Sequence, residues 1–178
     1  MTAKECILTR RSIRQFQDTP IDHEVLNGII ETASYAPSWK HTQIVRYIAI
    51  EGELKEKVAA CTSAYPRNGE IMNNAPMVIA VTMIKNRSGF ERDGSFSTPK
   101  GTGWQMFDAG VASQTFCLAA SEQGIGSVIM GIFDEAEVSA VLNIPEEREL
   151  VCLIPIGYPA ETPNAPRRKP VEELVTYM

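Results

Sequence analysis

Residues 104–123 carry almost no charge and constrain the fold more than any other stretch of this chain. Asp108 and Glu122 are the only charged residues, and many others are small enough to let a second helix approach closely: Ala109, Gly110, Ala112, Ser113, Ala119 and Ala120. A helix that is apolar all round is buried in a core or in an interface. The stretch therefore predicts a long covered helix that Gly124 caps. It offers more apolar surface than one subunit of 178 residues needs to bury, so we expect an obligate homodimer.

Shorter patterns predict the other elements. The run 76–84 is almost entirely apolar, which indicates a central strand covered on both faces. Asp22 is a candidate cap for a helix that ends before Pro37, and the D-x-x-E pattern at Asp134 predicts the start of another helix. Further helices are expected over 2–11, 53–62 and 171–175, and further strands over 44–50, 128–131 and 149–157. The pattern predicts an α+β fold, an α/β sandwich, in a single domain spanning 1–178.

Composition and missing motifs exclude several classes of protein. The net charge of −5 argues against a general nucleic-acid surface, and no apolar run approaches the roughly 20 residues that span a bilayer. There is no G-x-G-x-x-G, P-loop or G-x-S-x-G motif and no secretory pattern. Neither histidine pairs with a cysteine at ligand spacing, so no metal site is expected. We expect a cytoplasmic protein without nucleic-acid or membrane partners, with four buried, reduced thiols: Cys6, Cys61, Cys117 and Cys152.

Basic side chains cluster near the N-terminus in residues 10–16, Arg-Arg-Ser-Ile-Arg-Gln-Phe. A guanidinium is a planar fork of donors that matches a phosphate, and Ser12 adds a hydroxyl. On a helix, Arg10 and Arg14 share a face and repel each other unless an anion lies between them. The cluster therefore predicts a phosphate site, and the alternative is a solvated basic helix end. The basic run 167–169 is open to the same two interpretations.

Residues 85–103 are polar and glycine-rich, with Phe90, Phe96 and the adjoining Trp104 as aromatic exceptions. A loop of this length in a compact domain is functional or disordered. Few apolar anchors and several glycines predict mobility, and the aromatic residues are suited to closing over a ligand. We expect a lid at the edge of the ligand site, with a floppy surface loop as the alternative.

Five motifs in order give the chain a resemblance to the FMN-dependent nitroreductase family, covering nearly all of it from Arg10 to Val175. They are 10–16 (RRSIRQF), 36–43 (APSWKHTQ), the small-residue helix 108–120, the glycine-bounded stretch 124–133, and 156–159 (IGYP) followed by 167–170 (RRKP). Two positions depart from the family pattern. His41 stands where the family usually has asparagine, which affects a polar contact to the flavin, and Ile44 stands where it usually has proline.

The resemblance implies a nitroreductase-like fold: a central, mostly antiparallel sheet flanked by helices, in an intertwined homodimer with one FMN per subunit. The residues it places near the FMN phosphate and ribityl chain are Arg10, Arg11, Ser12, Arg14, Arg167 and Arg168. Those it places at the polar edge of the ring or at the ribityl hydroxyls, on the FMN held mainly by the other subunit, are Pro37, Ser38, Trp39, Lys40, His41 and Gln43. Met130 and Gly131 are expected against one side of the ring, where a backbone N–H can bond N5.

The activity that the resemblance implies needs no protein nucleophile, so no residue is assigned a catalytic role. The flavin carries the redox chemistry while the protein binds and orients. NAD(P)H is expected to deliver hydride to N5, leave, and be replaced by a nitroaromatic, quinone or similar small oxidant in a ping-pong cycle. The alternatives are a specialised flavin enzyme of the same fold and a flavin- or anion-binding module without turnover.

Overall fold

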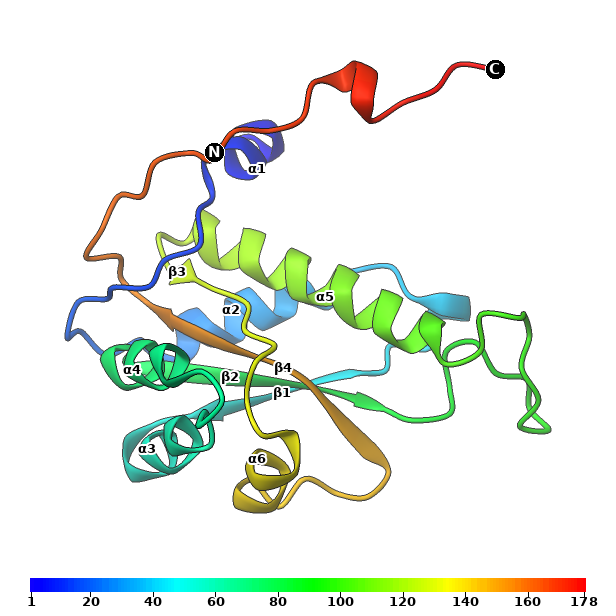
Figure 1. The fold of residues 1–178 in the computed structure, drawn as a ribbon, viewed down its shortest axis with the longest axis horizontal. Coiled ribbons are helices and arrows are strands. Elements are labelled where there is room, and N and C mark those ends of the chain that lie inside the picture. Colours follow the sequence, from blue (N-terminus) through cyan, green and yellow to red (C-terminus); the bar gives the residue numbers. More distant parts are fainter.

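A four-stranded antiparallel sheet forms the centre of the computed structural model, which describes residues 1–178 (Figure 1). Its strands are β1 (Val45–Ile50), β2 (Met77–Ile84), β3 (Gly126–Ser127) and β4 (Arg148–Gly157), in the spatial order β1-β2-β4-β3. The two long central strands pair from Met77↔Ile156 to Ile84↔Arg148, with one register shift beside Val81 and Thr82. The α+β class with an antiparallel sheet is therefore confirmed.

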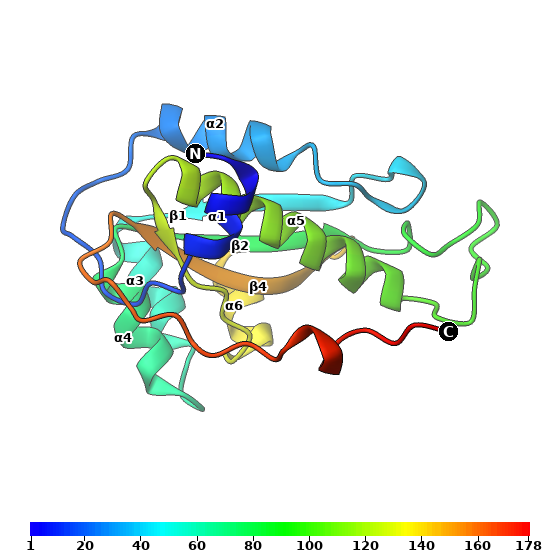
Figure 2. The ribbon, with the colours of Figure 1, turned by 90° about the horizontal axis from the view of Figure 1, so that it is seen from above.

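Helices cover both faces of this sheet (Figures 1 and 2). On one face lie α2 (His23–Ala33) and α5 (Gly103–Glu122), which contact each other. On the other face lie α3 (Gly52–Ala60), α4 (Pro66–Asn74) and α6 (Glu135–Val141). The short helix α1 (Ala3–Thr9) contacts α5, and the thiol of Cys6 donates to Leu118 O at 3.3 Å. This arrangement is the sandwich that the sequence predicts.

The central strand β2 shows why the sandwich holds together. Met77, Ile79 and Val81 pack into the core beneath α2 and α5, while Val78 and Ala80 pack into the core beneath α3, α4 and α6. All five are fully buried, so the prediction of a strand covered on both faces is confirmed. Burying a large aliphatic side chain contributes about 1.5–3 kcal/mol, and β2 does so on both faces at once.

Three sequence predictions about elements are wrong. Helix 2–11 ends already at Thr9, and 171–175 is only a 3₁₀ turn, Val171–Glu173. The strand expected at 128–131 is reduced to one bridge between Met130 and Leu153, preceded by β3. The ladder breaks there because Val128 N–H donates to Pro155 O at 3.3 Å, and a proline has no N–H to return the bond.

Helix α4 is an element that the sequence patterns do not predict. Its asparagines and Gly69 have low helix propensity, and the apolar period is short. Gly69 instead allows close packing, since a Cβ there would lie 2.7 Å from Ala59 O on α3. Pro66 at the first helical position is the one local signal for this helix.

The four cysteines are free and buried, as predicted. Burial raises the pKa of the Cys117 thiol and raises that of Cys152 to about 11, so neither is activated as a nucleophile. No helix is both long and apolar enough to traverse a bilayer. Beyond β4 the chain passes α1 and extends away from the body of the domain, and its last segment, 161–178, is largely exposed (Figure 1).

Tyr47 should titrate far later than an ordinary tyrosine. Its ring stacks on Phe116 with centroids 5.4 Å apart, and burial raises its pKa to about 12 from 10.0. The neutral phenol is favoured in the fold, so its stabilising contribution is complete below pH 10 and is lost as the pH rises from 10 to about 12. Alkaline titration followed by phenolate absorbance should show one late component that Tyr47→Phe removes. Retention of that component in the variant would contradict the assignment.

Candidate active site

The arginine-bearing segment 10–16 docks onto a pair of glycines at the end of the sheet. Gly126 and Gly157 are paired across β3 and β4. A Cβ on Gly126 would lie 2.8 Å from Ile13, and one on Gly157 would lie 2.9 Å from Phe16, so both glycines are needed for the close approach. Ile13 N–H donates to Ser127 O at 3.0 Å and completes the attachment.

A second attachment comes from the turn after β4. The carboxylate of Glu161 accepts hydrogen bonds from the backbone N–H groups of Arg14 and Gln15. Ala160 N–H donates to Gln15 O at 2.9 Å, and Gln17 N–H donates to Tyr158 O at 2.8 Å. These bonds hold the backbone of the segment while the guanidinium of Arg14 stays free of carboxylates.

The basic side chains of the segment lack anionic partners. None of the predicted phosphate ligands takes part in an ion pair: Arg10, Arg11, Arg14, Arg167 and Arg168. Arg11 donates to Leu8 O at 2.7 Å and to Arg10 O at 2.8 Å, so it caps the end of α1. The shared helical face of Arg10 and Arg14 is a wrong prediction, because the chain leaves the helix at Thr9 to bury Ile13 and Phe16.

A cavity of about 240 Å³ opens beside this segment. Arg10 and Arg11 line it together with residues of two further segments, 124–127 and 159–163. Arg14 lines a neighbouring hollow that α4 closes with Arg67 and Asn74. Arg167 and Arg168 lie on the exposed C-terminal segment, and no hydrogen bond or ion pair joins them to the 10–14 stretch.

The second predicted ligand segment, 37–43, is a strained turn. Lys40, His41 and Gln43 all have positive φ, at 43°, 56° and 47°. Left-handed backbone is costly for residues with a Cβ and concentrates at ligand clamps and switches. Ser38 supports the turn, because its Oγ accepts the N–H of Gln43 at 3.0 Å. Trp39 packs against Trp104 with tilted rings whose centroids are 4.6 Å apart, and its indole Nε1 is buried without a hydrogen-bond partner.

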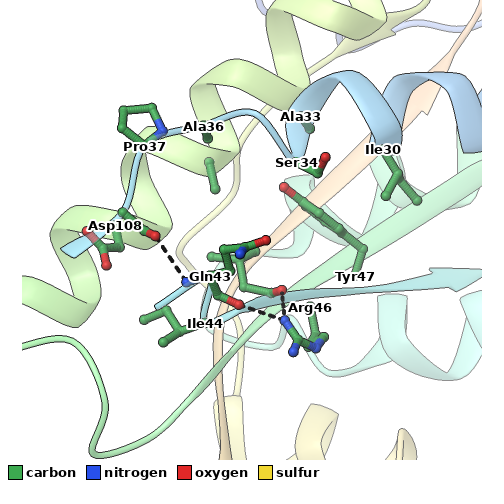
Figure 3. Close-up of a pocket in the computed structure, with 13 residues that line it drawn as sticks. Ile30, Ala33, Ser34, Ala36, Pro37, Gln43, Ile44, Arg46, Tyr47 and Asp108 are labelled. Carbon is green, nitrogen blue, oxygen red and sulfur yellow. Dashed lines mark hydrogen bonds between the residues drawn. The ribbon is translucent and has the colours of Figure 1, made fainter. Parts of the chain in front are cut away.

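This segment borders a cavity of about 340 Å³ (Figure 3). Pro37, Ser38 and Gln43 line it from the turn, together with residues of α2 and β1. Asp108 and Ala112 of α5 close it on the helix side. Within one chain, members of the two groups of predicted flavin ligands thus line separate cavities, one near each end of α5.

Met130 and Gly131 play different parts. Met130 is 4% exposed, its N–H and C=O both bond Leu153, and its side chain packs in the core. Gly131 is exposed, its N–H donates to no protein group, and a Cβ built on it meets nothing within 4 Å. Next to it, Asn68 Nδ2 of α4 donates to Ile132 O at 2.9 Å.

The sequence analysis misses three polar residues near the site, because they lie on α4, a helix that it does not predict. Asn74 Oδ1 accepts the N–H of Phe16 at 2.8 Å, Asn68 fixes the backbone beside Gly131, and Arg67 faces the hollow that Arg14 lines. Asp108, for which the sequence predicts no catalytic role, accepts hydrogen bonds from the turn at Trp39 and from Ser88. Pro66, which favours the first position of a helix, is the sequence signal that could have identified Asn74, Asn68 and Arg67.

Comparison with known proteins decides the family. Residues 7–158 match the Nitroreductase family. This chain belongs to the nitroreductase family. The nitroreductase assignment confirms the resemblance drawn from the five motifs and makes the chain an enzyme of the NAD(P)H nitroreductase type.

Individual relatives add detail. A Methanothermobacter thermautotrophicus protein, provisionally named an NADH dehydrogenase/NAD(P)H nitroreductase, is 32% identical over 169 residues, 92% of this chain and 81% of the relative. A nitroreductase family protein from Streptococcus pneumoniae has the same fold, with a TM-score of 0.87 over 99% of this chain and all of the other, at 24% identity. A Desulfovibrio desulfuricans protein, provisionally named a nitroreductase and crystallised with FMN, is 25% identical with a TM-score of 0.78, over 98% and 95% of the two chains.

Proposed function

We propose that this nitroreductase binds one FMN per subunit between the two chains of a homodimer, and uses it to pass hydride from NAD(P)H to nitroaromatics, quinones or similar small oxidants. The observation that carries the proposal is a set of arginines without anionic partners, on a backbone tightly built onto Gly126 and Gly157. A relative of the same fold was crystallised with FMN, which supports the choice of ligand. The buried thiols favour a reducing location, the cytoplasm.

The residues fit the two ends of FMN. Arg10 and Arg14 supply the charge for a phosphate dianion, since guanidinium–phosphate bonds are charge-assisted and strong. Arg168 approaches only if the C-terminal segment folds back or comes from a partner. Gly131 leaves room for a flat ring and a free N–H near it, because no side chain stands in the way. FMN held there would supply the hydride-transfer chemistry between NAD(P)H and the oxidant.

The two separated cavities favour a dimer. Ser121 at one cavity comes thirteen positions after Asp108 at the other, which is roughly 20 Å along a helix with a 1.5 Å rise. A two-fold pairing that crosses two copies of α5 brings the N-terminal half of one helix beside the C-terminal half of the other. The turn 37–43 of one chain then reaches the FMN whose phosphate the other chain holds.

The surface offers apolar groups for such an interface. Met106 and Phe107 are 48% and 61% exposed on the outer side of α5, where Gly110 also lies open. The C-terminal segment adds four more exposed apolar residues that would cover the partner: Val171, Leu174, Val175 and Tyr177. Large apolar patches on a protein surface mark interaction sites.

Phe107→Glu is expected to convert the dimer into monomers and to release FMN. A carboxylate cannot be buried unpaired in an apolar interface. Light scattering gives the mass, and unfolding should lose its dependence on protein concentration. Leu54→Glu is the matched control, because Leu54 is 39% exposed on α3, on the other face of the sheet. A monodisperse monomer that retains FMN, seen with the unsubstituted protein, would overturn the dimer.

Gly131→Val tests the ring end. A Cβ at this position meets no protein atom within 4 Å, so the melting temperature of the variant should equal that of the parent. FMN binding should weaken roughly ten-fold, because the valine side chain keeps FMN from forming one backbone hydrogen bond, which is worth up to about 1.5 kcal/mol. Flavin fluorescence titration of the apo-protein measures the affinity. Gly28→Val is an equally unobstructed control on α2, and equal affinity in both variants would remove Gly131 from the site.

Colour and bleaching test the function as a whole. The purified protein should be yellow, release FMN on acid extraction, and bleach when NADH or NADPH is added without oxygen. A quinone should then restore the colour. Extraction of FAD, or of no flavin after expression with ample riboflavin, would refute the cofactor. Bound FMN that NAD(P)H does not bleach would favour the binding module without turnover.

A further inference from the structure

Asp108 is a buried carboxylate for which the proposed chemistry has no use. It lies on α5, is 3% exposed, and forms no ion pair. Burying a charge without a cationic partner is costly unless hydrogen bonds replace its water. The donors that do so come from two segments far apart in sequence, the turn 37–43 and the loop 85–103.

From the first segment, the backbone N–H of Trp39 donates to both carboxylate oxygens of Asp108, at 3.1 Å to Oδ1 and 3.0 Å to Oδ2. Trp39 is the residue immediately before the left-handed positions Lys40 and His41. A charge-assisted bond is about twice as strong as a neutral one. Asp108 therefore anchors the entrance of the strained turn (Figure 3 shows its carboxylate beside this turn).

From the second segment, the hydroxyl of Ser88 donates to Asp108 Oδ2 at 2.6 Å. Ser88 is fully buried, and its Oγ also lies 2.7 Å from Thr42 Oγ1. Because the single proton of Ser88 goes to the carboxylate, Thr42 is the donor in this second bond. One continuous chain of bonds thus joins the loop, the helix and the strained turn.

The rest of the loop is attached at its base and folded on itself at its tip. Gln105 Oε1 of α5 accepts the backbone N–H of Asn86 at 2.5 Å. At the tip, Phe90 and Phe96 pair with ring centroids 4.8 Å apart. An exposed ion pair also joins the tip to the turn, Lys40 to Glu91 at 2.8 Å, and its hydrogen bond lowers the pKa of Glu91. Exposed pairs contribute little, so the buried bonds at Asp108 are the stronger polar connection.

We propose that Asp108 is a positioning residue that couples the 85–103 loop to the flavin-contacting turn 37–43, so that FMN binding and ordering of the loop favour each other. This inference rests on the proposed function, because the turn must contact FMN. Coupling between two sites is reciprocal: if an ordered loop strengthens FMN binding, bound FMN must order the loop by the same factor. The flavin site and the lid then respond as one unit when an oxidant enters.

Limited proteolysis measures this coupling without any turnover. Trypsin can cut the loop after the exposed residues Arg92 and Lys100. Saturating FMN should slow these cuts in the unsubstituted protein by about five-fold or more, a typical size for coupled sites. Ser88→Ala removes one buried hydroxyl and keeps the carboxylate. In this variant FMN should give less than two-fold protection, and FMN affinity should fall by the factor that the protection loses, about five-fold, because the coupling is reciprocal.

Two control variants separate coupling from general loosening. Ser113→Ala removes a buried hydroxyl from the same helix. That hydroxyl bonds only Ala109 O and Cys152, so FMN should protect the loop of this variant from trypsin as well as it protects the parent. Glu91→Gln breaks the exposed pair, and it too should retain the protection. Asp108→Asn keeps the shape but loses an acceptor, so its protection should lie between those of the parent and Ser88→Ala.

The outcomes are distinguishable. If the parent binds FMN and Ser88→Ala shows the same FMN-dependent protection as the parent, the coupling is refuted while the proposed function stands. Loss of protection in Glu91→Gln alone would move the connection to the surface and would equally refute it. A parent that binds no FMN overturns the proposed function, and this inference with it.

Discussion

Replacing Arg10 and Arg14 together by alanine is expected to weaken FMN binding about 100- to 10,000-fold, since each charge-assisted contact is worth roughly 1.5–3 kcal/mol. The fold should tolerate the change, because neither guanidinium forms an ion pair and the backbone of the segment is held by Glu161 and Ser127. Turnover of enzyme saturated with FMN should change far less than affinity. Flavin fluorescence titration of apo-protein, with melting curves in parallel, makes the measurement.

A charge control keeps this result interpretable. Arg92→Ala removes a positive charge from the exposed loop, far along the chain from the segment, and should leave FMN affinity close to that of the parent. Each single variant, Arg10→Ala and Arg14→Ala, should lose about 10- to 100-fold, although neighbouring contacts on one phosphate need not add. Parental affinity in the double variant would mean that the arginines bind something other than FMN.

The second large effect is expected from Gly157→Ala. The added methyl carbon would lie 2.6 Å from Pro76 Cδ, 2.9 Å from Phe16 Cδ1 and 3.0 Å from Phe16 Cβ, so Phe16 or the strand must move. Such overpacking costs about 1–3 kcal/mol, or roughly 2–12 °C in melting temperature for a chain of this size. Because Phe16 lies two residues after Arg14, the displacement should also weaken FMN binding.

The matched control for Gly157→Ala is Gly28→Ala on α2, where a Cβ meets nothing within 4 Å. That substitution should stabilise the fold by about 0.4–1 kcal/mol, because alanine restricts the unfolded chain more than glycine does. Calorimetry and FMN titration of both variants give the two readouts. An unchanged melting temperature in Gly157→Ala would show that the segment 10–16 can shift without loss of stability, and that its close packing against Gly157 is not required.

The sequence predicts the layers of this fold well, for identifiable reasons. The composition of the uncharged stretch that becomes α5 and of the apolar run that becomes β2 predicts that both are buried. Both elements lie where predicted. The errors occur where tertiary contacts override local pattern. The first helix stops early because Ile13 and Phe16 are buried on the sheet, and α4 forms from weak helix formers because Gly69 packs on α3.

The candidate site was predictable as a list of residue types but not as an arrangement. Arginine chemistry and motif order indicate a phosphate ligand, whereas the division of the ligands between two cavities depends on where α5 places its ends. The sequence carries no signal of the role of Asp108, because a buried acid in an apolar helix has the same pattern whichever groups donate hydrogen bonds to it. Its donors, Trp39 and Ser88, meet only in three dimensions.

The left-handed backbone at Lys40, His41 and Gln43 limits how this enzyme can be evolved in the laboratory. A library meant to widen the range of oxidants would naturally randomise these exposed positions. Valine, isoleucine and threonine are disfavoured there whatever they would contact, because branching at Cβ makes positive φ costly. Glycine, asparagine and aspartate enter freely. The backbone conformation therefore decides which residues this turn can accept, and side-chain chemistry selects only among those.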